Sequence, residues 1–208
     1  MKGLQNIVTL VTMTQEHSPW FHWLVGVESS MPLLNKEKDV FPENLFDTID
    51  SLQTDKARGW WAMQTLPRCE KKLMRCLIES EVPFYAPVIE KRYRSPKGRA
   101  RRAFVPLFSN YVFVFGGHED LYKAKTTGSV CNQLQVPNAA EFVEDISRIY
   151  RAILTGEPVL PESKLEAGSA VRVKTGPFKG FEGIVIRREN QIRLLIGVRC
   201  MGQGISVE

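Results

Sequence analysis

The chain has 208 residues, of which 43% are hydrophobic and 25% are charged, and its net charge is +5. This length allows one large domain or two small ones, and the composition is that of a globular protein with a hydrophobic core. No apolar run approaches the roughly 20 residues that span a bilayer, and no cleavage site follows the first apolar residues. We therefore expect a cytoplasmic protein with no signal peptide and no membrane contact.

The cysteines and histidines do not form a catalytic or metal-binding pattern. None of Cys69, Cys76, Cys131 and Cys200 stands in a C-x-x-C pair, and the three histidines are far apart. The sequence also has no phosphate-binding loop and no nucleophile–base signature. We interpret the cysteines as free, buried thiols of a reducing compartment, with Cys69 and Cys76 on one helix face. We expect no enzymatic activity, no cofactor and no metal site.

Charge is distributed unevenly along the chain. Residues 1–55 carry 3 basic and 8 acidic side chains, a net charge of −5, whereas residues 56–111 carry 13 basic and 4 acidic ones, a net charge of +9. The net charge is −2 over residues 112–160 and +3 over residues 161–208. A strongly basic middle segment indicates a nucleic-acid contact that is localised there.

Residues 1–55 form an acidic N-terminal arm that contains aromatic side chains. Its aromatic runs lie at residues 20–25 and 41–47, and neither is long enough to build a domain core. We expect a mostly extended arm that docks aromatic rings onto the folded body. A partner-binding arm is the alternative.

Strands and helices alternate over residues 56–138. The expected elements are a strand at 60–65, a helix from Pro67 to before Pro83, a strand at 84–92, a basic hairpin tip at 93–102, a strand at 106–115, a helix at 119–126 and a strand reaching Val136. This order predicts an α+β fold of the split βαβ kind, with an antiparallel sheet and flanking helices.

The strand expected at residues 106–115 is apolar on both faces. Alternation places Phe108, Asn110, Val112 and Val114 on one face, and it places Leu107, Ser109, Tyr111, Phe113 and Phe115 on the other. Such a strand is either covered on both faces or covered on one face while the other binds a partner.

Two further regions complete the chain. Residues 139–163 are a helical linker, whose helix has an apolar stripe that includes Phe142, Ile146 and Ile149. Residues 164–208 contain short Val- and Ile-rich strands and a glycine-rich turn, which predict a small β-barrel.

Two separated segments resemble the NusG family of transcription elongation factors. The Trp60-Trp61 pair and the block Pro106–Val114 resemble the family's N-terminal (NGN) domain, and residues 171–185 resemble its KOW motif, with Gly176, Pro177 and Gly180 in place. The resemblance covers about residues 58–208. It implies an NGN-type domain at 56–138 and an SH3-like KOW β-barrel at 164–208.

The chain departs from the general family pattern in two ways. Ser109-Asn110 replaces Pro-Gly, and Asn tolerates the left-handed backbone that such a turn requires. An Asn before the Tyr resembles RfaH, a specialised paralogue, and the acidic arm is a further departure. Both favour a specialised paralogue over the general factor.

The resemblance implies a mechanism and a set of partners. In the family, the N-terminal domain grips the clamp helices of the RNA polymerase β′ subunit and suppresses pausing, while the KOW domain contacts Rho, ribosomal protein S10 or RNA. We expect a monomer that promotes processive elongation or antitermination. An RNA-binding or ribosome-associated KOW module is the alternative.

The resemblance and the residue types select three groups of candidate binding residues. The candidates for polymerase binding, each of which could instead be a core residue, are Trp60, Trp61, Phe108, Asn110 and Tyr111. The candidates for contact with DNA at the upstream fork or the non-template strand, on a hairpin that could instead be only solvated, are Arg94, Lys97, Arg99, Arg101 and Arg102. The candidates for the KOW partner are Gly176, Pro177, Phe178, Gly180 and Phe181, with Phe181 expected to be buried and Phe178 partly exposed.

Overall fold

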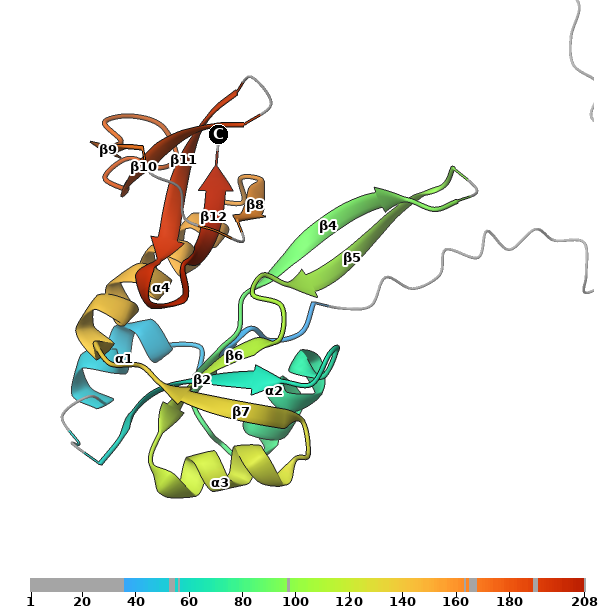
Figure 1. The fold of residues 1–208 in the computed structure, drawn as a ribbon, viewed down its shortest axis with the longest axis vertical. Coiled ribbons are helices and arrows are strands. Elements are labelled where there is room, and N and C mark those ends of the chain that lie inside the picture. The colour runs from blue at the N-terminus through green and yellow to red at the C-terminus, as the bar shows by residue number, and fades with distance from the viewer. Residues whose placement is uncertain are drawn as a thin grey trace, which may run out of the picture. The chain divides into compact units, whose positions relative to one another are not determined.

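The fold is shown by a computed structural model (Figure 1). The structure describes residues 36–52, 55, 57–96, 98–162, 164, 168–188 and 191–207. The aromatic run at residues 20–25 and the candidate Lys97 lie outside the described residues.

The first sheet has five antiparallel strands in the order β1-β3-β6-β2-β7. Their bounds are β1 Val40–Phe41, β2 Gly59–Thr65, β3 Phe84–Tyr85, β6 Tyr111–Gly116 and β7 Val130–Gln135. Strand β6 lies between β2 and β3, which the helix α2 (Glu70–Glu79) connects. This is the split βαβ arrangement that the sequence predicts, and the predicted α+β class is confirmed.

Both faces of β6 are covered. Val112 and Val114 pack with α2 and α3 (His118–Thr126), while Phe113 and Phe115 pack with α4 (Ala139–Leu154) and α1 (Leu45–Leu52). Figure 1 shows α2 and α3 on one side of the sheet and α4 on the other. The interpretation that both faces of this apolar strand are covered therefore applies to the centre of β6.

The predicted continuous strand at 106–115 is wrong, because two strands occupy that stretch. Strand β5 (Ala100–Pro106) ends at the first residue of the stretch, and β6 begins at Tyr111. Between them Asn110 has φ = 65°, which turns the chain. The strand predicted at 84–92 is likewise divided into β3 and β4 (Val88–Arg94). Within the described part of the chain, strands β4 and β5 pair only with each other, as a two-stranded ribbon.

The predicted burial of the cysteines is only partly correct. All four are free, but Cys131 and Cys200 are exposed, while Cys69 and Cys76 are half-buried. Helix α2 begins at Glu70 and not at Pro67, and it turns Met74 into the core in place of Cys76. No helix in the described part of the chain is long and apolar enough to cross a membrane.

The described part of the N-terminal arm is folded. Strand β1 extends the sheet by pairing with β3, and α1 buries Leu45 and Ile49. The ring of Phe46 stacks on Tyr150 of α4, with centroids 4.5 Å apart, and meets Tyr85 edge-on at 5.0 Å. An aromatic ring of the arm thus docks on the body, as expected, but the expectation of a mostly extended arm does not hold for its described part, which forms β1 and α1.

The second sheet also has five antiparallel strands, in the order β8-β12-β11-β10-β9. Their bounds are β8 Val159–Glu162, β9 Ser169–Arg172, β10 Glu182–Arg188, β11 Gln191–Val198 and β12 Gln203–Val207, with a 3₁₀ turn η2 at Arg199–Met201. A Cβ added to Gly183 would lie 2.4 Å from the carbonyl oxygen of Leu195, so the close approach of β10 and β11 requires glycine there. Short antiparallel strands at this end agree with the predicted small β domain.

Candidate partner-binding surface and nucleic-acid interface

The turn before β6 is fixed by hydrogen bonds. The backbone N–H of Asn110 donates to Oε1 of Glu70 at 2.7 Å, and the N–H of Thr65 donates to the carbonyl of Asn110 at 2.8 Å. Glu70 itself is buried. A buried carboxylate that accepts a backbone N–H makes a strong, charge-assisted bond, so helix α2 holds the left-handed Asn110 in place. The sequence did not reveal this role of Glu70.

The turn brings Phe108 and Tyr111 to one side of the sheet. Phe108 is buried and meets Phe113 edge-on, with centroids 5.4 Å apart. Tyr111 is half-buried against the same hydrophobic cluster. Alternation along one straight strand would have put Phe108 and Tyr111 on opposite faces, and the bend at Asn110 removes that conflict.

The two tryptophans point to opposite faces of β2. Trp60 is fully buried, and its ring lies 5.4 Å from Phe142 of α4 and 5.5 Å from Phe115. Trp61 is half-buried against the cluster beneath α2 and α3. The candidates Trp60, Phe108 and Tyr111 therefore share one side of the sheet, and Trp61 lies on the other.

Strand register adds two residues to the side that carries Tyr111. Gln64 pairs with Tyr111, and Leu134 of the edge strand β7 pairs with Ala62 on the same face. The side chain of Leu134 is 47% exposed. Helix α4 covers this face at Trp60 and Phe113, so the open part lies toward β7. We call Tyr111, Gln64 and Leu134 the sheet surface; neither Gln64 nor Leu134 was a candidate, since only pairing reveals them.

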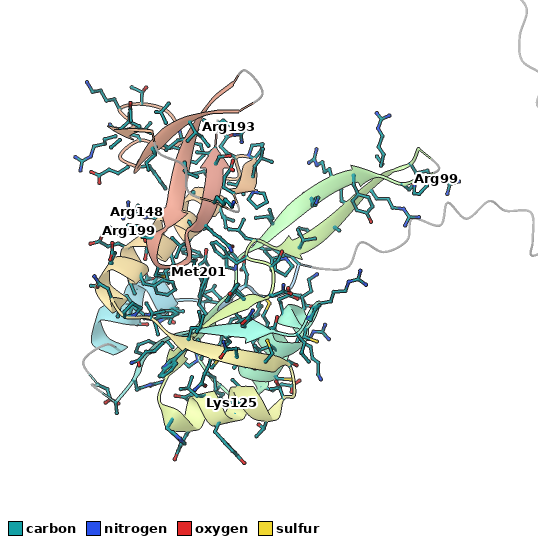
Figure 2. The ribbon with its side chains drawn as sticks, in the orientation of Figure 1. Arg99, Lys125, Arg148, Arg193, Arg199 and Met201 are labelled. Atoms are coloured by element: carbon teal, nitrogen blue, oxygen red, sulfur yellow. The ribbon has the colours of Figure 1, made fainter. Side chains whose placement is uncertain are left out.

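The basic candidates lie on the β4–β5 ribbon. Arg94, Arg99, Arg101 and Arg102 are all exposed, and Figure 2 shows Arg99 near the tip. Pairing sets Arg92 opposite Arg102 and Tyr93 opposite Arg101. The tip is closed by hydrogen bonds between Ser95 and Arg99. A projecting two-stranded ribbon with exposed cations has the geometry to contact nucleic-acid phosphates.

Three further cations, Lys71, Lys72 and Arg75, have partners in the fold. Lys71 donates to the carbonyl of Phe104 at 2.7 Å, and Lys72 donates to the carbonyl of Thr127 at 3.3 Å. Arg75 forms an ion pair with Glu37 at 3.4 Å. The basic patch is thus concentrated on the ribbon.

In the glycine-rich turn of the C-terminal sheet, the burial of the two phenylalanines differs from the prediction. Phe178 is buried and Phe181 is half-buried, the reverse of the prediction. Their rings meet edge-on at 5.7 Å, and the guanidinium of Arg151 lies 5.5 Å from the Phe181 ring. Gly176 and Gly180 have φ of 86° and 87°, which explains the glycines. Gly176, Pro177 and Gly180 are all exposed.

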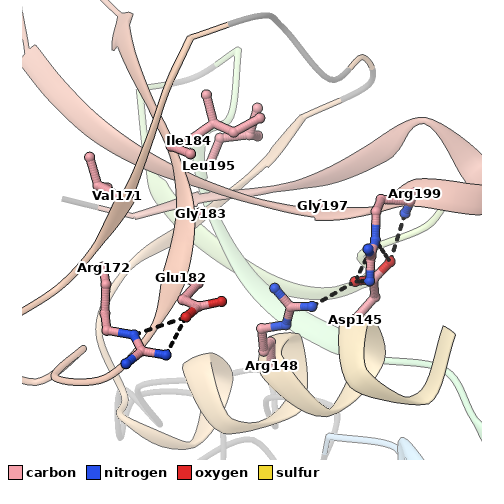
Figure 3. Close-up of a pocket in the computed structure, with 11 residues that line it drawn as sticks. Asp145, Arg148, Val171, Arg172, Glu182, Gly183, Ile184, Leu195, Gly197 and Arg199 are labelled. Carbon is pink, nitrogen blue, oxygen red and sulfur yellow. Dashed lines mark hydrogen bonds and ion pairs between the residues drawn. The ribbon is translucent and has the colours of Figure 1, made fainter. Parts of the chain in front are cut away.

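Helix α4 and the C-terminal sheet enclose a cavity of about 410 Å³ (Figure 3). At its edge Asp145 accepts hydrogen bonds from Arg148 and Arg199. On its far side Arg172 donates to Glu182. Each charged side chain that lines the cavity has a partner within the fold, so these charges contribute to the packing of α4 on β11. The described residues contain no group of His, Cys, Asp and Glu that could hold a metal ion.

Comparison with known proteins finds a similarity over most of the first sheet and the helices α2, α3 and α4. Residues 58–156 match the model of a family described as NusG, transcription termination factor nusG. The chain is 26% identical to the transcription termination/antitermination protein NusG of Borreliella burgdorferi over an alignment of 180 residues, which covers 73% of this chain and 95% of that protein. The match begins after α1, so β1 and α1 lie outside the family region. Residues 58–156 are therefore similar to a NusG-type domain, and the chain resembles a NusG transcription termination/antitermination protein over most of its length.

Proposed function

We propose that this protein binds the clamp helices of the RNA polymerase β′ subunit through the sheet surface and promotes processive elongation. The observation that carries the proposal is the half-open face of the first sheet, where Tyr111 pairs with Gln64 and Leu134 lies on the same face, paired with Ala62 two residues along β2. Partly exposed aromatic and aliphatic groups with no charge between them suit the apolar stripe of a partner helix.

The buried candidates have a supporting role in this proposal. Phe108 and Trp60 lie beneath the surface and fix its shape through Phe113 and Phe142. Asn110 sets the turn that presents Tyr111. Trp61 faces the α2–α3 side, so we assign it to the core rather than to the contact.

The ribbon and the C-terminal domain would supply two further contacts. We assign the exposed arginines of the ribbon, Arg94, Arg99, Arg101 and Arg102, to DNA at the upstream fork or the non-template strand. Around the turn at residues 176–181, the exposed Gly176, Pro177 and Gly180 are the groups that we assign to a second partner, whether Rho, ribosomal protein S10 or RNA.

Binding of the full chain to isolated clamp helices, measured by calorimetry, tests the proposal. Tyr111→Ala and Leu134→Ser should each weaken binding, by roughly 10- to 30-fold if they are central contacts. Tyr122→Ala is the matched control, because that ring on α3 is 65% exposed and lies on the other side of the sheet. Unchanged affinity for both surface variants would contradict the assignment.

The alternative function has its own outcome in the same system. If the chain does not bind the clamp helices but binds structured RNA, it is an RNA-binding or ribosome-associated module. In vitro transcription on a pausing template, with and without Rho, would then separate general elongation support from antitermination.

A further inference from the structure

The β4–β5 ribbon has two chemically different faces. Alternation and pairing put Glu90, Arg92 and Arg102 on one face, while Lys91, Tyr93 and Arg101 lie on the other. All six side chains are exposed. The two faces therefore offer solvent different sets of groups.

On the first face the central cations are bound to a carboxylate. Glu90 forms ion pairs with Arg92 at 2.9 Å and with Arg102 at 3.8 Å. A phosphate approaching this face would have to compete with Glu90 and would be repelled by it. The positive charge available to a nucleic acid is correspondingly reduced there.

The second face combines an open aromatic ring with cations. The side chain of Tyr93 is 46% exposed, and Arg101 lies directly across from it. Lys91 stands two residues earlier on the same strand and the same face. Among the described residues of the ribbon, no acidic side chain lies on this face, and the Tyr93 ring has no aromatic or cation–π partner in the described part of the chain.

We propose that Tyr93 is a stacking platform for an unpaired nucleobase, with Lys91 and Arg101 contacting the flanking phosphates. Exposed aromatic rings between cations bind single strands because every base has a flat face on which a ring can stack. In a duplex those faces are covered by neighbouring base pairs, so the ring has nothing to stack on. The ligand is therefore single-stranded nucleic acid, and the inference rests on the proposed nucleic-acid contact of the ribbon.

Fluorescence anisotropy with the full chain tests this assignment. The probes are a labelled 12-nucleotide thymidine strand, its uridine counterpart, a 12-base-pair duplex, and a strand of equal length with abasic sites. Tyr93→Ala should weaken binding of the thymidine or uridine strand by about 5- to 150-fold and should leave the duplex and abasic strand unchanged. Tyr93→Phe keeps the ring and should bind like the wild type. Comparison of the thymidine and uridine strands shows whether DNA or RNA is preferred.

Arginine variants separate this inference from the function on which it rests. Arg101→Ala should weaken all four probes and lower the slope of log affinity against log salt by about one, whereas Arg92→Ala, on the Glu90 face, should have a smaller effect. If Tyr93→Ala changes all probes equally or none, while Arg101→Ala still lowers the salt slope, the stacking role is wrong and the phosphate contact stands. If no probe binds at low salt, or Arg101→Ala alters nothing, both proposals fail.

Discussion

Asp145 of α4 accepts hydrogen bonds from both the backbone N–H and the guanidinium group of Arg199, which follows β11. The backbone N–H of Arg199 lies 2.9 Å from Oδ2 of Asp145, and its Nη2 lies 3.0 Å from Oδ1. Asp145 is only 1% exposed, and Arg148 of the same helix also donates to it at 3.1 Å (Figure 3). The hydrogen bond to Asp145 raises the pKa of Arg199 above its ordinary value. One buried carboxylate thus ties the last helix to the second sheet.

Asp145→Asn should destabilise the chain by about 1–3 kcal/mol, because the neutral amide can neither balance the two guanidinium groups nor accept all their hydrogen bonds. The free energy of unfolding in urea checks this value. Glu144→Gln is the control, since Glu144 is exposed and pairs with Arg199 at 3.7 Å; such a pair contributes at most about 1 kcal/mol. Equal losses in the two variants would show that the burial of Asp145 has no energetic consequence.

The turn at Asn110 predicts a different response to glycine and to alanine. A left-handed residue with a Cβ is strained by roughly 1–2 kcal/mol, and Asn relieves part of that strain. Asn110→Ala should therefore lower the free energy of unfolding by about 1 kcal/mol, whereas Asn110→Gly should stay within about 0.5 kcal/mol of the wild type. Ser109→Ala, the exposed neighbour, is the control and should change nothing. A loss of stability in the glycine variant as large as that in the alanine variant would contradict this account.

The sequence predicted what depends on local pattern. Alternation revealed that the centre of β6 is apolar on both faces, and charge counting located the basic ribbon. Alternation could not show that Asn110 reverses the parity between Phe108 and Tyr111, because that needs a backbone angle. Register was equally invisible, so neither the exposed Leu134 beside Ala62 nor the neutralising role of Glu90 could be inferred.

Long-range packing explains the remaining differences. No core could be predicted for the arm from its own sequence, because Phe46 stacks on Tyr150, which is about a hundred residues away in the chain. The burial of Phe178 and Phe181 was predicted in reverse because a glycine turn has no period from which a buried side can be inferred. Contacts across such distances follow from the folded topology and leave no local signature.

The arm should contribute to stability although it lies outside the NusG-type region. Phe46→Ala removes a ring that is stacked on Tyr150 and set edge-on to Tyr85, and it should cost about 2 kcal/mol of unfolding free energy. Leu154→Ala, at an exposed apolar side chain, is the control for truncation and should cost little. A thermal melt of both variants checks the difference. An unchanged melt for Phe46→Ala would mean that α1 is not held by its aromatic contacts.

The burial of Tyr85 predicts that the protein loses stability at alkaline pH. Its hydroxyl is buried and has no hydrogen-bond partner among the described residues. Burial first, and then the charge of Asp39, raise the pKa of Tyr85 well above its ordinary value of 10.0. The contribution of the neutral phenol is therefore complete below pH 10 and is lost as the pH rises from there toward the folded pKa, since the unfolded chain ionises first.

Tyr85→Phe should remove this dependence. Near pH 7 the variant should be as stable as the wild type or more stable by up to about 2 kcal/mol, because an unpartnered buried hydroxyl is eliminated. Above pH 10 its advantage should grow by about 1.4 kcal/mol per pH unit. Urea unfolding at pH 7, 10 and 11 measures both effects, with Tyr122→Phe as the exposed control. A constant difference between Tyr85→Phe and the wild type at all three pH values would show that Tyr85 ionises as readily in the fold as in the unfolded chain.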